Sequence, residues 1–262
     1  MLIVFAGPSL PPRDRGRWSE SPVPVELRPP AQQGDVLRAV GERPWGLGLV
    51  DGYFEWVPAV WHKEILWALG KGVRVYGAAS MGALRASELA PYGMRGVGWV
   101  VDRFLTGELE ADDEVTVVHG DADDGYLPLS VPLVNVRATL ERAVDQGMID
   151  GGAAESIVMR LRTTYYPDRT HTAIVDAAQT VLPAGDADRL VDWWTANAID
   201  VKRSDAIEMV DRMVADRGAE GPEPERARFR FEHTDAWEQV LRQVSATQVP
   251  TGTPSGLSLI HI

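Results

Sequence analysis

A serine lies between a strand-like run and a helix-like run in the first third of the chain. Residues 73–76 are mostly β-branched or aromatic, the next residues are small, and residues 83–89 are rich in helix formers. The pattern predicts a strand, a tight turn and a helix, with Ser80 at the turn between Gly77 and Gly82. A serine on such an elbow can act as a nucleophile, because N–H groups at the helix start can stabilise an oxyanion. A close-packed corner or an anion-binding helix N-terminus is the alternative interpretation.

Two other predicted strands also end in small or polar residues. The apolar run 2–6 is followed by Gly7 and then Ser9, and the run 46–50 is followed by Asp51. In a parallel sheet, binding sites form outside the carboxyl ends of the strands. We therefore expect these two ends to share a pocket with the serine elbow, although Asp51 can also serve only to form the Asp-Gly turn. The candidate binding residues are Gly7, Ser9, Gly77, Gly82 and Arg85.

Two histidines are candidates for a base that would activate Ser80. His62 lies in a predicted helix that follows Pro58, and His119 follows a predicted strand over residues 115–118. Glu64 or Asp51 would orient the histidine, as the third member of a catalytic triad does. The candidate catalytic residues are therefore Ser80, His62, Glu64, His119 and Asp51.

Each of these candidates also has a structural interpretation. His62 can be a packing or capping histidine, and Glu64 can form an ion pair with Lys63. Arg85 and Glu88 stand three residues apart, which suits a surface ion pair on one helix face. The choice between chemistry and structure therefore needs the positions of these side chains.

Composition excludes several classes of site. The chain has 262 residues, 45% of them hydrophobic, and no cysteine, so disulfides, thiolate metal sites and a cysteine nucleophile are excluded. The net charge of −12 argues against a nucleic-acid binder. The acidic run 108–114 is typical of a solvated surface. We predict no metal and no cofactor.

The order of the predicted elements indicates an α/β protein. Strands alternate with helices in the first half, which predicts a parallel sheet, and helical periodicity dominates after Pro132. We expect a core α/β domain over residues 1–130, an all-helical region over 131–216 that packs internally, covers the sheet or docks a partner, and a flexible tail over 217–262. We hypothesise that the final residues, LSLIHI, are artefactual, because a sequencing adaptor can encode that string.

The apolar start of the chain is too short for a targeting segment. Residues 1–6 lack a basic region and are interpreted as a first strand. No apolar run approaches the roughly 20 residues that span a bilayer. These features predict a cytoplasmic protein with no membrane partner.

Several blocks together resemble the TfuA-like family. GPSL, VDGYFEWVPAVWHKEIL, GAASMGALRASEL, YGMRGVGWV and DDEVTVVHG occur in that order within residues 3–120, and the likeness is weaker in the helical half. The resemblance implies a partner of a YcaO-type enzyme, which uses ATP to activate a peptide-backbone amide for thioamidation. It also implies delivery of sulfur from a thiocarboxylated ThiS-like carrier protein, with the peptide or protein substrate bound through the YcaO enzyme. His62 is the histidine of the matching block.

Three functions are compatible with these patterns. The first is hydrolysis of the carrier thiocarboxylate by Ser80 and a histidine, which would release sulfide. The second is a non-catalytic activator or scaffold that bridges the YcaO enzyme and its sulfur donor. The third is a stand-alone serine hydrolase, since GAASMGA resembles the nucleophile turn of Clp-type serine peptidases over a short stretch.

Overall fold

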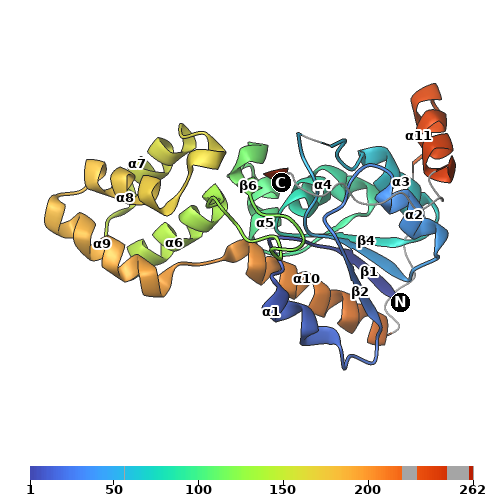
Figure 1. The fold of residues 1–262 in the computed structure, drawn as a ribbon, viewed down its shortest axis with the longest axis horizontal. Coiled ribbons are helices and arrows are strands. Elements are labelled where there is room, and N and C mark those ends of the chain that lie inside the picture. The colour runs from blue at the N-terminus through green and yellow to red at the C-terminus, as the bar shows by residue number, and fades with distance from the viewer. Residues whose placement is uncertain (56, 220–228, 247–259, 262) are drawn as a thin grey trace.

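The computed structural model describes residues 1–55, 57–219, 229–246 and 260–261. Its central sheet has five parallel strands in the order β2-β1-β3-β4-β5 (Figure 1). The strands are β1 (Leu2–Phe5), β2 (Val25–Arg28), β3 (Gly46–Leu49), β4 (Arg74–Gly77) and β5 (Arg95–Gly96). The predicted α/β class with a parallel sheet is therefore confirmed.

Both faces of the sheet are buried, as β1 illustrates. Side chains alternate along a strand, so Leu2 and Val4 face one side while Ile3 and Phe5 face the other. All four are at most 2% exposed. This two-sided burial explains the continuous apolar run in the sequence. Ile3 and Phe5 pack into a core to which α2 (Asp35–Gly41), α3 (His62–Gly70), α4 (Met81–Leu89) and α5 (Trp99–Thr106) contribute residues.

The opposite face of the sheet is covered by α10 (Val201–Gly218). Its Met209 and Met213 pack in one buried cluster with Leu2, Val4 and Tyr76. Trp18 of the short element η1 (Gly16–Trp18) packs in the same cluster, and the preceding helix α1 (Pro12–Arg15) buries no residue. A helix from the C-terminal half thus completes the core of the N-terminal half.

Four helices form a separate lobe at one end of the molecule (Figure 1). They are α6 (Leu133–Asp145), α7 (Gly151–Arg162), α8 (His171–Val181) and α9 (Ala184–Asn197). Their apolar faces enclose a core of their own that includes Leu140, Ile157 and Leu190. The predicted helical region therefore both packs internally, through α6 to α9, and covers the sheet, through α10. The domain boundaries stay a prediction.

The helix expected after Pro58 and the strand expected over 115–118 differ from their predicted bounds. The helix expected after Pro58 begins only at His62, because the Glu64 carboxylate accepts the Trp61 N–H at 3.2 Å and caps the helix there. The strand expected over 115–118 is β6 (Val117–Val118), which lies outside the central sheet and pairs with β7 (Ile260–His261).

The remaining elements are short or lie near the C-terminal end. They are η2 (Ala90–Tyr92), η3 (Asp112–Glu114), η4 (Tyr166–Asp168) and α11 (Asp235–Ala246). Most of the predicted linker 217–230 and most of the final LSLIHI string lie outside the described residues. Over the part of the chain that the structure describes, no helix combines the length and apolar character needed to cross a bilayer.

Candidate functional site

Asp51 joins the ends of two neighbouring strands. It follows β3 and is 1% exposed. Its Oδ2 accepts the backbone N–H groups of Gly7, at 2.8 Å, and of Ser9, at 3.0 Å. Its Oδ1 accepts the Ser9 hydroxyl at 2.7 Å. The carboxylate thus fixes the loop after β1 and holds the Ser9 side chain in one orientation.

The Ser80 elbow is tightly built. Ala79 has a φ of 65°, and the Ser80 N–H donates to the Ala78 carbonyl at 2.7 Å. A hydrogen bond from the N–H of residue i+2 to the carbonyl of residue i, with a positive φ at the residue between them, defines the strained form of the γ-turn. The residues expected at a nucleophile elbow therefore do make a sharp strand-to-helix turn.

Close backbone contacts press this elbow against the end of β3. The Gly82 N–H donates to the Val50 carbonyl at 3.1 Å, and the Ala78 N–H donates to the Leu49 carbonyl at 3.1 Å. A Cβ at Gly82 would lie 1.8 Å from the Leu49 carbonyl oxygen, so any other residue would clash. A Cβ at Gly77 would lie 2.1 Å from the Gly82 carbonyl oxygen. Both glycines permit the close approach of α4 to the sheet.

The Ser80 hydroxyl is enclosed. Ser80 is 0% exposed, and its Oγ has no hydrogen-bond partner among the described residues. Within the described part of the chain, the Ser80 hydroxyl therefore forms no hydrogen bond to any other candidate catalytic residue.

His119 lies in the same buried region as Asp51. It is 0% exposed, its Nδ1 donates to the Gly120 carbonyl, and its ring centre lies 5.5 Å from that of Tyr126. Burial lowers the pKa of His119 to about 4, while the charge of Asp51 opposes that shift. The imidazole is consequently neutral at neutral pH.

His62 lies apart from this region, on the surface. Its Nε2 bonds to the Glu88 carboxylate at 2.6 Å, and the Arg85 guanidinium donates to the same carboxylate at 3.0 Å. The side chains of His62 and Glu88 are both 46% exposed. The predicted pairing of Arg85 with Glu88 is thus present, and it includes the histidine.

Glu64 has a structural position. It is 0% exposed and accepts the Gly34 N–H at 2.8 Å in addition to the Trp61 N–H. Burial raises its pKa to about 7, although these N–H groups oppose the shift. The carboxylate ties the start of α3 to the start of α2, and its hydrogen bonds do not extend to His62.

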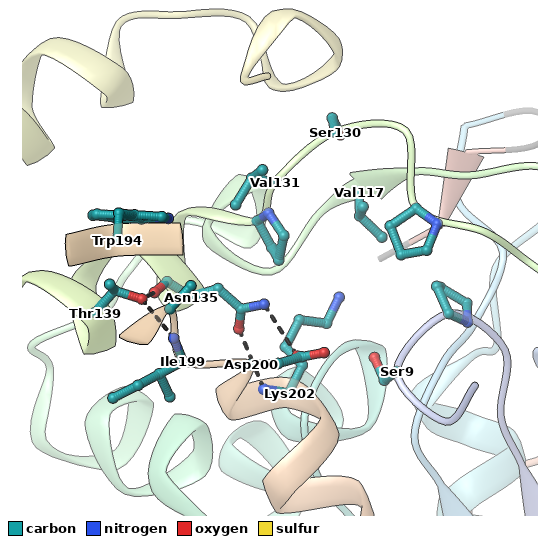
Figure 2. A pocket seen from close by; sticks show the side chains of 14 residues that line it. Ser9, Val117, Ser130, Val131, Asn135, Thr139, Trp194, Ile199, Asp200 and Lys202 are labelled. Carbon is teal, nitrogen blue, oxygen red and sulfur yellow. Dashed lines mark hydrogen bonds between the residues drawn. The ribbon is translucent and has the colours of Figure 1, made fainter. Parts of the chain in front are cut away.

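A pocket of about 260 Å³ opens beside the Asp51 region, between the sheet and the helical lobe (Figure 2). Ser9 lines it from the loop after β1, and Val117 and Ser130 line it from β6 and the following loop. Trp194 of α9 and Lys202 of α10 line it from the C-terminal half. The pocket therefore combines residues from distant parts of the chain, such as Ser9 and Lys202, which lie 193 positions apart.

Lys202 is a pocket residue that the sequence patterns do not reveal. It is 2% exposed, and its Nζ donates to the Val115 carbonyl at 2.6 Å. Burial lowers its pKa, and the negative charges of Asp51 and Asp200 oppose this. No motif surrounds Lys202, and its position in an amphipathic helix is also compatible with a surface residue, so only the packing of α10 on the sheet brings it here.

The fold and this region define a class: an α/β protein with buried Asp, Ser, His and Lys side chains beyond the carboxyl ends of parallel strands. Residues 51–170, somewhat less than half of the chain, match the family model described as TfuA-like protein, which supports a TfuA-like classification. Members of this family are generally associated with YcaO partners. No curated protein matches the chain significantly. The matched segment includes Asp51, Ser80 and His119, whereas Ser9 and Lys202 lie outside it.

Proposed function

We propose that this TfuA-like protein supplies sulfide for YcaO-dependent peptide thioamidation in the cytoplasm by hydrolysing the thiocarboxylate of a ThiS-like carrier. The reaction takes up one water: the acyl thiocarboxylate and water give the acyl carboxylate and hydrogen sulfide. The single observation that carries the proposal is the buried polar region of Ser9, Asp51 and His119 beside the 260 Å³ pocket. Such a site offers both a basic group and a place for an acyl chain.

The geometry supports a role for these residues in activating water. Attack on the acyl carbon requires a group that removes a proton from the nucleophile. His119 is neutral at neutral pH, and the charge of Asp51 favours the protonated form that His119 would adopt on accepting a proton as this base. Asp51 holds the loop and the Ser9 hydroxyl that borders the pocket. Ser80 remains a candidate nucleophile on the neighbouring strand end, and its use would require the elbow to open, since its hydroxyl is enclosed.

The test measures sulfide release and carrier mass after mixing the purified full chain with thiocarboxylated carrier, without the YcaO enzyme. We expect His119→Gln and Asp51→Asn to lower the turnover rate by about 100-fold or more, the usual effect of removing a general base or its support. Ser80→Ala tests the nucleophile directly. His62→Ala is the matched control, because this histidine is bonded to Glu88 on the surface.

The outcomes of this test separate the candidate residues. Turnover that survives His119→Gln, Asp51→Asn and Ser80→Ala would remove all three from the mechanism. Loss of turnover in His62→Ala alone would place the chemistry on the surface, at the cluster with Arg85 and Glu88. Melting curves of each variant show whether a lost activity reflects unfolding.

A non-catalytic activator or scaffold is the second candidate, and the Ser80 elbow favours it. The Gly82 N–H is committed to Val50, and the N–H groups of Ala83 and Leu84 donate to the Ser80 carbonyl. These groups are therefore not available for an oxyanion in this arrangement. A scaffold would bind the YcaO enzyme and the carrier in pull-down experiments and would release no sulfide from the carrier alone.

A further inference from the structure

The pocket shown in Figure 2 has mostly apolar walls and two charged side chains, those of Lys202 and Asp200. Val117, Val131 and Ile199 supply aliphatic surface, and the Trp194 indole forms one end. Among the described residues that line it, Lys202 is the only cationic side chain. In Figure 2 this side chain extends from the start of α10 into the space between the other residues drawn.

The Lys202 ammonium has hydrogen-bonding capacity to spare. A lysine ammonium has three N–H donors, and one of these is used by the Val115 carbonyl. For the other two, the described residues provide no hydrogen-bonded acceptor. Because a buried charge is costly unless it is paired, an anion in the pocket would stabilise this ammonium. The start of the 18-residue helix α10 adds the positive end of its dipole.

The acidic groups that face Lys202 are already engaged or solvated. Asp51 accepts three hydrogen bonds from Gly7 and Ser9. Asp200 is exposed, and its Oδ1 accepts from the Asn135 amide and from the Arg203 N–H, both at 3.1 Å. His119, whose pKa burial lowers, adds no charge at neutral pH. Lys202 therefore keeps the capacity to bind one more anionic group.

The geometry points to a peptide-carboxylate site: we propose that this pocket binds the anionic carboxylate or thiocarboxylate end of an extended peptide, with Lys202 as its counter-charge. One cation matches one carboxylate, whereas a phosphate group needs several strong donors. The apolar walls suit the chain that precedes the carboxylate. This inference rests on the proposed function for the identity of the peptide, the end of the carrier, and assigns Lys202 as a binding residue.

Binding is measured by calorimetry with N-acetyl-Ala-Gly as a free acid and as its C-terminal amide, two probes that differ in charge at one end. We expect the acid to bind the full chain at least about tenfold more tightly than the amide, the size of one charge-assisted hydrogen bond. Lys202→Met should abolish this preference. Lys71→Met is the control, because Lys71 is exposed and stacks over Trp67 with its Nζ 4.3 Å from the ring centre.

A second measurement keeps the test independent of variant folding. The chain has three lysines, Lys63, Lys71 and Lys202, so labelled lysine gives three NMR signals. We expect the acid to shift the Lys202 signal and to leave that of Lys71 in place. Affinity should fall at high pH as Lys202 loses its proton, since the anion pairs only with the ammonium; Asp51 and Asp200, which face it, favour the charged form.

Several results would overturn the inference: equal binding of acid and amide, unchanged preference in Lys202→Met, a static Lys202 signal, or inorganic phosphate that binds as tightly as the acid. The probe is a carboxylate and is not turned over. Binding of the acid without any hydrolysis of carrier thiocarboxylate would therefore refute the proposed function and leave this site standing. Hydrolysis of carrier thiocarboxylate by a chain that does not bind the acid would refute this site and leave the proposed function standing.

Discussion

Replacing Asp51 by alanine tests whether its carboxylate holds the two strand ends together. The substitution removes the acceptor of the Gly7 and Ser9 N–H groups and of the Ser9 hydroxyl. A buried donor left without a partner costs about 1–3 kcal/mol. The hydroxyl borders the pocket and can turn to water, so the two amides set the expected loss, about 2–6 kcal/mol in the free energy of unfolding.

Asp51→Asn gives a second, smaller expected effect. The Asn carbonyl oxygen can accept both N–H groups, and its amide can donate to the Ser9 hydroxyl, which then acts as an acceptor. Only the contribution of the charge is lost, which we expect to cost about 1 kcal/mol. The difference in the free energy of unfolding between Asp51→Asn and Asp51→Ala therefore measures the cost of leaving the two N–H groups without an acceptor, separately from the cost of losing the charge.

Urea unfolding of the full chain, followed by circular dichroism, measures both effects. Asp102→Ala is the control, because Asp102 is an exposed residue in the first turn of α5 and its loss should cost less than about 1 kcal/mol. The reasoning is refuted if Asp51→Ala unfolds within about 1 kcal/mol of the wild type at an unchanged urea dependence, or if Asp51→Ala and Asp51→Asn are equally stable.

Three further substitutions have defined outcomes. Burial raises the pKa of Glu64 to about 7. The folded state therefore keeps a proton on Glu64 that the unfolded chain releases above about pH 4. The stability that this bound proton contributes is lost as the pH rises through about 7. Glu64→Gln should remove that loss in urea unfolding between pH 4 and about 8, and identical pH dependence in variant and wild type would contradict it. Gly82→Ala puts a Cβ 1.8 Å from a β3 carbonyl oxygen, so it should lower the free energy of unfolding by about 3 kcal/mol or yield insoluble protein. Gly70→Ala should have no such effect, because a Cβ there meets nothing within 4 Å. Equal melting temperatures of the two variants would argue against the close contact at Gly82. Met209→Ala should lower the free energy of unfolding by about 2–5 kcal/mol, because it leaves a cavity between α10 and the sheet. Met159 is 55% exposed, so Met159→Ala should change that free energy by under about 0.5 kcal/mol. Similar losses in the two variants would show that α10 does not cover the sheet as described.

Much of the fold follows from local patterns in the sequence. The strands β1, β3 and β4 are short apolar runs bounded by glycine or polar residues, and these runs predict buried parallel strands. The polar residues after them, such as Asp51 and Ser9, are predicted to converge because parallel strands end at one edge. The hydrogen bonds between these two residues realise that convergence.

Local sequence patterns did not predict that the candidate catalytic residues lie in different environments. His62 and Glu64 are two positions apart, yet one is on the surface with Glu88 and the other is buried against Gly34. Adjacent positions on a helix point in different directions, and which direction is buried depends on what packs there. The sequence alone therefore does not choose between an ion pair, a cap and a catalytic group.

The sequence by itself determined the elements, the serine elbow and the resemblance to the TfuA-like family, because steric preference, side-chain period and turn chemistry act over a few residues. Only the tertiary structure decided that Ser80 is enclosed, that α10 covers the sheet and that Lys202 lies beside Ser9 in one pocket. Burial and electrostatic environment arise from contacts between segments far apart in the chain. They are therefore properties of the packing, which no local pattern contains.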